Sequence, residues 1–175
     1  MIDLMIDIET LGVVPEANIS TIAAQLFDPF ADGYTEDDHF YSRISPESQP
    51  NRIVSESTLD WWAKQPKEAK EEAFGDADRI DLKVALEKLA KLIWRSDHVW
   101  SQGPTFDMNI LENAYREYDI NFPWDFWNIR DSRTVFSLYP DLVMPKVEHH
   151  ALADCRRQIL LLQKTLKHLK VERIK

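Results

Sequence analysis

The first ten residues alternate apolar and polar side chains with the period of two that is typical of a β-strand. In the opening MIDLMIDIET, the four apolar positions from Ile2 to Ile8 share one face, and Asp7 and Glu9 point to the other. A strand is therefore predicted over residues 2–8. Its C-terminal end carries two carboxylates where a strand that joins a core would be expected to carry apolar side chains.

The same kind of pattern predicts the remaining elements. Strands are expected over residues 19–27 and 39–44, joined by a turn-rich segment, so the first three strands should form an antiparallel meander. A short strand over 98–101 should end at Gly103-Pro104. Helices are expected from Ser57 to near Pro66, with residues 57–60 as a capping box, over 81–95, 105–118 and 132–138, and from His150 onward. This order predicts a single α/β domain, residues 1–175, with a mixed sheet.

Charge and composition narrow the class of protein. The net charge of −9 argues against a protein that binds nucleic acid by bulk charge alone. Residues 146–175 nevertheless carry a net charge of +5, which is either a solvated helix face or a landing surface for a polyanion. The single cysteine excludes an internal disulfide, and the chain has neither an 18-residue apolar run nor a signal-peptide pattern. A cytoplasmic protein without a membrane span is therefore expected.

Carboxylates at three separate points of the chain are the candidate chemistry. Asp7 and Glu9 should lie about 7 Å apart at Cα on one face of a strand, where they repel unless a cation lies between them. Asp107 falls on the inward face of a helix that follows a strand, and Asp154 falls at the edge of the apolar stripe of the last helix. Each has an ordinary alternative, which is a solvated strand end for the pair and a favourable position near a helix N-terminus for the other two.

Taken in order, these segments resemble the three motifs of the DEDDh 3′–5′ exonucleases. The resemblance is carried by DIET at 7–10, FD at 106–107 and HHALAD at 149–154. It implies a ribonuclease H-like fold with a mixed five-stranded sheet. DIETLG, TLDWWAKQP, VWSQGPTFDMNIL and PWDFWNIRDSRT, within residues 1–160, resemble a small bacterial and phage branch described as 3′–5′ exoribonucleases or exodeoxyribonuclease A. Gln102 departs from the Asn that many relatives have there, which should alter the shape of the loop and leave the chemistry unchanged.

The resemblance also implies roles for five residues. Asp7, Glu9, Asp107 and Asp154 would bind two divalent ions, Mg²⁺ or Mn²⁺, because hard cations prefer oxygen ligands. His149 would be the general base that takes a proton from the attacking water. His150 occupies a variable position of the motif and is assigned no role.

The substrate would be the 3′ end of RNA or of single-stranded DNA. Thr10 and Leu11 match positions that touch the terminal nucleotide in relatives, and Phe106 could stack on its base or belong to the core. Trp127 and Arg130 lie in an aromatic and basic stretch that suits single strands. Alternatively, the tryptophans pack the domain or a dimer contact, and Arg130 pairs with the adjacent aspartate.

Two other functions remain open on the sequence alone. One is a non-catalytic nucleic-acid-binding or regulatory module on the same fold, although none of the five motif residues is missing. A weaker alternative is a phosphatase for small phosphoesters, but the four glycines are scattered and form no phosphate-binding loop. The sequence does not decide between RNA and DNA. It does not decide the oligomeric state either, so a homodimer stays possible.

Overall fold

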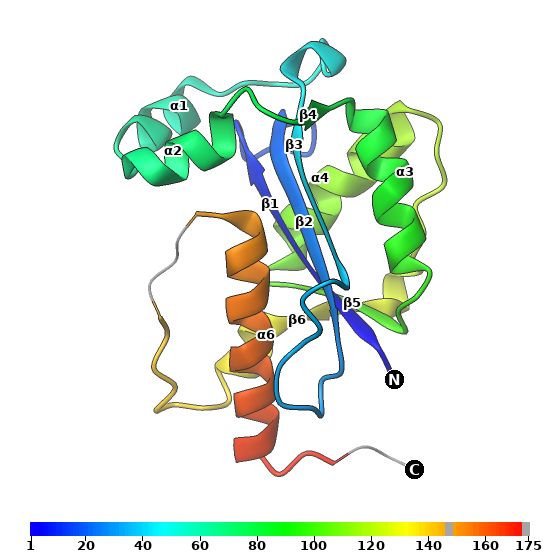
Figure 1. Cartoon of the computed structure of the whole chain (residues 1–175), viewed down its shortest axis with the longest axis vertical. Helices are drawn as coiled ribbons and strands as arrows, with labels where there is room; N and C mark the ends of the chain where they lie inside the picture. Colours follow the sequence, from blue (N-terminus) through cyan, green and yellow to red (C-terminus); the bar gives the residue numbers. More distant parts are fainter. Residues whose placement is uncertain (146–148, 173–175) are drawn as a thin grey trace.

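A six-stranded mixed sheet in the order β4-β3-β2-β1-β5-β6 forms the centre of the computed structural model, which describes residues 1–145 and 149–172 (Figure 1). The pairs β1–β2 and β2–β3 are antiparallel, which confirms the meander, and the other pairs are parallel. The strands are β1 (Asp3–Thr10), β2 (Ile19–Phe27), β3 (His39–Ile44), β4 (Arg79–Ile80), β5 (His98–Ser101) and β6 (Ile129–Asp131). The expected count of five strands was too low by one. Strand β4 has only two residues, so it shows no alternation in the sequence.

Within residues 1–145 and 149–172, six α-helices and two short 3₁₀-helices connect and cover these strands. They are η1 (Pro46–Ser48), α1 (Glu56–Ala63), α2 (Lys67–Phe74), α3 (Leu82–Ile93), α4 (Pro104–Glu117), η2 (Phe126–Asn128), α5 (Ser132–Phe136) and α6 (Ala151–His168). Helix α2 was not expected, because it buries only Ala69 and Ala73 and therefore has no visible apolar stripe. The prediction of a capping box at residues 57–60 was wrong, because Ser55 is the N-cap of α1 and Ser57 lies inside the first turn.

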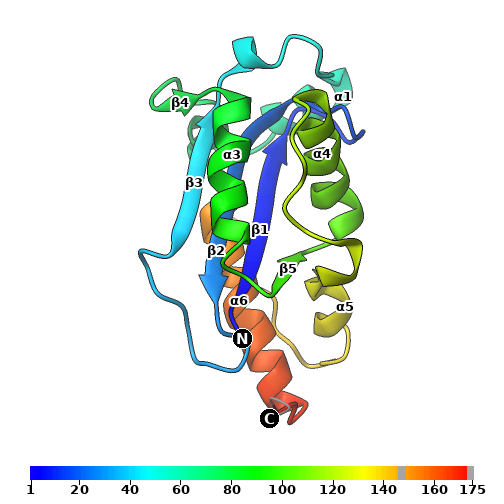
Figure 2. The same ribbon diagram turned by 90° about the vertical axis from the view of Figure 1, so that its right-hand side faces the viewer.

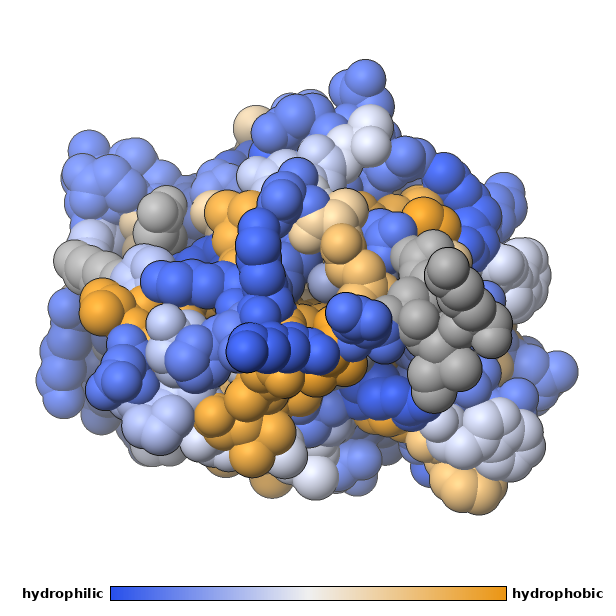
Figure 3. Space-filling view, turned by 90° about the horizontal axis from the view of Figure 1, so that it is seen from below, coloured by the Kyte–Doolittle hydropathy of each residue, from blue (hydrophilic) through white to orange (hydrophobic). Residues whose placement is uncertain are grey.

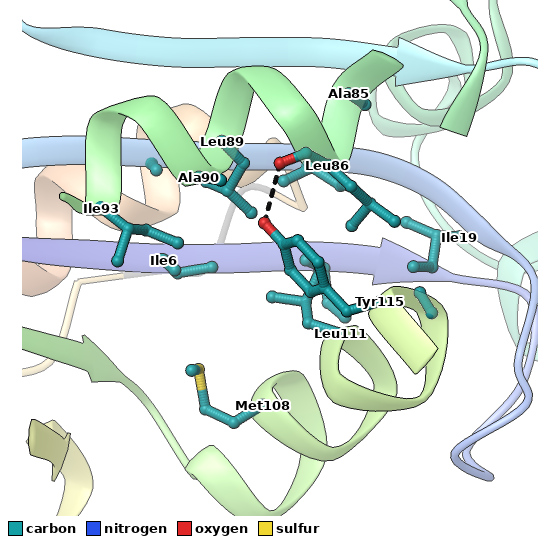
Figure 4. Packing of buried hydrophobic residues seen from close by; sticks show 14 of the residues in the cluster. Ile6, Ile19, Ala85, Leu86, Leu89, Ala90, Ile93, Met108, Leu111 and Tyr115 are labelled. Atoms are coloured by element: carbon teal, nitrogen blue, oxygen red, sulfur yellow. Dashed lines mark hydrogen bonds between the residues drawn. The ribbon is translucent and has the colours of Figure 1, made fainter. Parts of the chain in front are cut away.

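Helices α3 and α4 cover one face of the sheet, and the long helix α6 covers the other (Figures 1 and 2). The apolar face of β1, from Leu4 to Ile8, packs beneath α3 and α4 in the larger core. Figure 4 shows how this core is tied together: the Tyr115 hydroxyl of α4 donates to the carbonyl oxygen of Leu86 in α3 at 2.8 Å. The two helices are thereby held side by side over the centre of the sheet.

Helix α6 lies close to the two central strands. Cys155 is fully buried, and its sulfur lies 3.6 Å from the carbonyl oxygen of Met5 in β1 and 3.7 Å from that of Ala23 in β2. Met5 and Ala23 belong to the second core, together with Ile159 and Leu162 of α6. The first turn of α6 is thus placed beside the C-terminal half of β1.

Both described ends of the chain lie at the opposite end of the sheet, where α6 finishes (Figure 1). Seen from below in Figure 3, this end mixes hydrophobic patches with hydrophilic side chains. Of the basic residues expected in segment 146–175, Lys146, Arg173 and Lys175 lie outside the described residues. In the part of the chain that the structure describes, no helix combines the length and apolar character needed to cross a bilayer.

Candidate active site

Three elements bring the four candidate carboxylates to one cleft of about 320 Å³. Asp7 and Glu9 project from β1 towards α6, and Asp154 projects from the first turn of α6. One carboxylate oxygen from each of these three residues lies within 4.8 Å of the other two. Asp107, in the first turn of α4, reaches the same cleft from the side and accepts a hydrogen bond from the N–H of Ile8 at 3.3 Å.

The end of a strand pairing makes room for Asp107. The parallel pairing of β1 with β5 ends at Met5 and Trp100, so the two strands separate beyond that point. The N–H of Ile8 lies past this point and is bonded by Asp107 in place of a strand partner. The Asp107 carboxylate at the start of α4 thus replaces a strand partner for the Ile8 N–H of β1. This hydrogen bond fixes the carboxylate against the strand.

Burial raises the pKa values of Asp7, Glu9 and Asp107, and repulsion by acidic neighbours adds to the effect at Asp7 and Glu9. Burial, followed by the charges of its acidic neighbours, raises the pKa of Asp7 well above its usual value. The same causes raise the pKa of Glu9 to about 8. Burial raises the pKa of Asp107 to about 7, against the opposing effect of the Ile8 N–H. Without a cation the cleft therefore holds more negative charge than it can stabilise.

The donor set fits a divalent cation with hard oxygen ligands. Three carboxylates converge within 4.8 Å, and a fourth stands on the wall of the same cleft. Aspartate and glutamate oxygens are the ligands that Mg²⁺ and Mn²⁺ prefer in proteins. A bound cation would offset the repulsion that raises the pKa values of Asp7 and Glu9.

The raised pKa values predict how stability depends on pH in metal-free protein. Glu9 and Asp107 bind protons more tightly in the folded than in the unfolded chain, so their contribution is complete below about pH 4 and is lost as the pH rises through 7 and 8. The free energy of unfolding should therefore fall between about pH 5 and pH 8, as measured by urea denaturation in EDTA. Mn²⁺ should raise the melting temperature more at pH 8 than at pH 5.

A matched variant isolates this contribution. Glu9→Gln removes one of the titrating groups, so its metal-free stability should decline less steeply over the same pH range. Equal slopes for the variant and the unaltered protein would contradict the assignment of the pH dependence to this cleft.

His149 lies against the same cleft, immediately before α6. Its backbone has a φ of +54°, a left-handed conformation that is uncommon for a residue other than glycine. Its ring meets the ring of Trp61 edge to face, with 5.0 Å between centroids and an interplanar angle of 89°. The imidazole thus stands on the wall that faces the carboxylates.

His150 has a different setting from its neighbour. Its Nδ1 accepts a hydrogen bond from the N–H of Ala153 at 3.5 Å and so caps α6. Its Nε2 lies 3.7 Å from a carboxylate oxygen of Glu72 in α2, which the Tyr41 hydroxyl also bonds. The contacts of His150 therefore join α6 to α2.

A second cavity, of about 380 Å³, opens beside the carboxylates. Glu9 and Phe106 line both cavities, so the two are neighbours. Thr10, Trp61 and Trp62 contribute to its wall. The pairing of β1 with β2 shifts register between Glu9 and Thr10, where Ser20 of β2 is skipped, and such irregularities commonly re-aim side chains next to a site.

Comparison with known proteins identifies the family. The model of the 3′-5′ exoribonuclease Rv2179c-like domain matches residues 2–166. The chain belongs to this family. An exodeoxyribonuclease of Enterobacteria phage T4 is 27% identical over 207 residues, which cover 96% of this chain and 90% of that protein.

Solved structures share the fold at low sequence identity. The nuclease domain of 3′hExo, a DEDDh family member bound to rAMP, gives a TM-score of 0.67 at 14% identity over 99% of this chain and 96% of that one. E. coli exonuclease I in complex with single-stranded DNA gives 0.71 at 15% identity over 97% of this chain. This chain spans 41% of that exonuclease I chain and 64% of the cell-death related nuclease CRN-4. The protein is thus a 3′–5′ exonuclease, and its ribonuclease H-like fold is that of the DEDDh family member 3′hExo.

Of the predicted substrate contacts, some line the second cavity and others do not. Thr10 and Phe106 line the second cavity, and Phe106 also packs against the larger core, as one of its two expected settings requires. Stacking of Phe106 on a base stays a prediction. Leu11 packs against the cluster around Trp62 and is not among the residues that line either cavity.

Trp127 and Arg130 lie away from both cavities, in η2 and β6. Arg130 donates to the carbonyl oxygens of Trp127 at 2.6 Å and Ile129 at 2.9 Å. Asp131 caps α5 by accepting from the N–H of Arg133, so the suggested pair of Arg130 with Asp131 is not formed. The aromatic and basic composition of this stretch suggested a substrate contact. It could not show that the stretch forms η2 and β6, whose Trp127 and Arg130 line neither cavity.

Two residues of the site were not expected from the sequence. The Gln158 side-chain amide donates to a carboxylate oxygen of Asp7 at 2.8 Å. The Arg157 guanidinium donates to Asp154 at 3.0 Å. Their positions three and four residues after Asp154 place them one helical turn further on, so helical spacing from Asp154 could have identified both.

Proposed function

We propose that the protein removes nucleoside 5′-monophosphates one at a time from the 3′ end of RNA or single-stranded DNA, with two divalent cations, Mg²⁺ or Mn²⁺. The observation that carries the proposal is the convergence of Asp7, Glu9, Asp107, Asp154 and His149 on one cleft. The relatives support both substrates, because one is an exodeoxyribonuclease and the family is described as exoribonucleases.

Each residue of the cleft has a task in this reaction. When bound, the cations supply the positive charge that stabilises the attacking and leaving oxygens. The cations would be bound beside the phosphodiester by four carboxylates, those of Asp7, Glu9, Asp107 and Asp154. His149 accepts the proton of the attacking water, for which its imidazole must be neutral and within hydrogen-bond reach. Gln158 keeps the Asp7 carboxylate oriented through its 2.8 Å hydrogen bond.

The cavity of about 380 Å³ is a suitable place for the terminal nucleoside. It adjoins the carboxylates through Glu9 and Phe106, so a nucleoside there would leave its 5′-phosphate in the metal cleft. The Phe106 ring would contact the base face, which tolerates every base because stacking does not depend on hydrogen-bond pattern. Thr10 would contact the sugar, while Leu11, Trp127 and Arg130 are left out of this proposal.

A degradation assay with matched oligonucleotides tests the proposed function. RNA and DNA strands of one sequence, labelled at the 5′ end, should shorten in single-nucleotide steps with Mg²⁺ or Mn²⁺ and remain intact in EDTA. A 3′-labelled strand should release its label first, as a mononucleotide. Stable binding of strands without shortening in either metal would instead indicate the non-catalytic module. Faster turnover of a small phosphoester than of the oligonucleotide would indicate a phosphatase.

Three broader expectations belong with this proposal. The chain would act as a single catalytic domain, residues 1–175, and the family match over residues 2–166 supports this. A cytoplasmic location suits an enzyme with one buried, unpaired cysteine. The homodimer stays a prediction, which size-exclusion chromatography with light scattering would check.

A further inference from the structure

Two adjacent tryptophans on α1 have different surroundings. Trp62 is 3% exposed, and its indole N–H donates to the carbonyl oxygen of Thr10 at 3.0 Å. Trp61 is 43% exposed and packs edge to face on Trp62, with 5.0 Å between centroids. Trp62 therefore anchors the helix to the end of β1, and Trp61 rests on that anchor with one side open.

Trp61 borders two features that the proposed reaction needs. Its ring meets the His149 imidazole at 5.0 Å and 89°, while the more distant Trp62 ring lies 6.1 Å from the imidazole. The same Trp61 side chain lines the cavity of about 380 Å³. One partly exposed aromatic ring thus contacts the histidine and the space assigned to the terminal base.

The left-handed backbone conformation of His149 makes its ring contact with Trp61 important for the direction of the imidazole. A φ of +54° is uncommon for a residue with a Cβ atom, so contacts of the side chain help to decide whether this conformation is kept. The ring contact with Trp61 comes from α1, a different part of the chain, and edge-to-face aromatic pairs have a preferred geometry. Trp61 can therefore fix the direction of the imidazole.

We propose that Trp61 is a positioning residue that holds His149 towards the carboxylates, and that a base in the adjacent cavity immobilises Trp61 and so improves this positioning. The inference rests on the proposed function, because it takes His149 as the proton acceptor. It assigns to α1 a coupling between recognition of the terminal nucleotide and alignment of the general base.

Substitution of Trp61 tests the positioning role. Trp61→Ala should lower kcat on a DNA or RNA oligonucleotide by about ten- to a hundredfold, since misplacement of a reacting group by about 1 Å has effects of this size. Trp61→Phe should recover most of the loss, because it restores an aromatic ring beside His149. Leu59→Ala is the matched control: this residue is on the same helix, is 45% exposed and lies outside both cavities. An unchanged kcat in Trp61→Ala would overturn the proposal.

A substrate without its last base tests the coupling. An oligonucleotide with an abasic 3′-terminal residue leaves the cavity empty, so kcat should fall in the unaltered protein and fall much less in Trp61→Ala. Equal losses in both proteins would show that the base and Trp61 act independently, and would refute the coupling.

A readout without turnover separates this inference from the proposed function. The ring current of Trp61 should displace the NMR signals of the His149 imidazole protons, and Trp61→Ala should move them while leaving the His98 signals in place. If the protein degrades no oligonucleotide but the signals move, the proposed function fails and the contact stands. If degradation occurs and the signals do not move, the positioning role fails.

Discussion

Replacing Asp7 by Asn should reduce exonuclease turnover by about a thousandfold or more, because this carboxylate lies at the centre of the acidic cluster. The same change should stabilise the metal-free protein by about 1–2 kcal/mol, since it removes a buried charge repelled by its neighbours. The Asn side chain can still accept the hydrogen bond from Gln158. Single-turnover degradation assays and urea denaturation in EDTA measure the two effects.

The matched control for this prediction is Asp3→Asn. Asp3 lies on the same strand and the same face, is 1% exposed, and accepts a 2.7 Å hydrogen bond from the Trp100 indole and one from His98. Its substitution should lower stability but leave turnover nearly unchanged. Substantial turnover in Asp7→Asn would contradict the metal-site assignment, and lower stability in metal-free Asp7→Asn would contradict the repulsion argument.

Replacing His149 by Ala should lower kcat by about a hundredfold to ten-thousandfold, the range that general-base catalysis contributes. Mn²⁺ affinity, measured by calorimetry, should change little, because the acidic cluster formed by Asp7, Glu9 and Asp154 does not include the histidine. The variant should also bind a single-stranded oligonucleotide as tightly as the unaltered protein. This combination of lost turnover and retained binding distinguishes a proton acceptor from a ligand of the metal.

His150→Asn is the control for His149→Ala. Asn is a good N-cap, so it should keep the start of α6 in place while removing the neighbouring imidazole. Turnover should then stay close to that of the unaltered protein. A larger loss of kcat in His150→Asn than in His149→Ala would show that the roles of the two histidines had been exchanged.

Local periodicity accounts for the parts of the fold that the sequence predicted well. Strands β2 and β3 begin and end at the expected residues, and the faces of β1 divide as the alternation of Leu4, Met5, Ile6 and Asp7 requires. Strand β4 and helix α2 were missed because each has too few buried residues to create a period. Strand β4 is positioned by its pairing with β3, and α2 by the contacts of its Glu72 with Arg43 of β3, so no local window contains either signal.

The site was predictable to the extent that its residues follow one another in recognised motifs. The carboxylates and His149 do converge, because β1, α4 and α6 all begin or end at the same edge of the sheet. The position of Trp61 beside His149 could not be inferred, since it depends on how α1 folds back over the end of β1. Trp127 and Arg130 are of residue types that suit single-strand binding, but they lie just before and within the edge strand β6 and do not line the cleft.

The small side chain of Cys155 determines how closely α6 approaches the sheet. It fills the contact between α6 and the backbones of β1 and β2, with Met5 and Ala23 directly beneath it. A bulkier residue there would act as a wedge that lifts the helix and carries Asp154, the next residue back, away from Asp7. The distance between the carboxylates of Asp7 and Asp154 therefore depends on the size of a buried side chain that does not line the cleft.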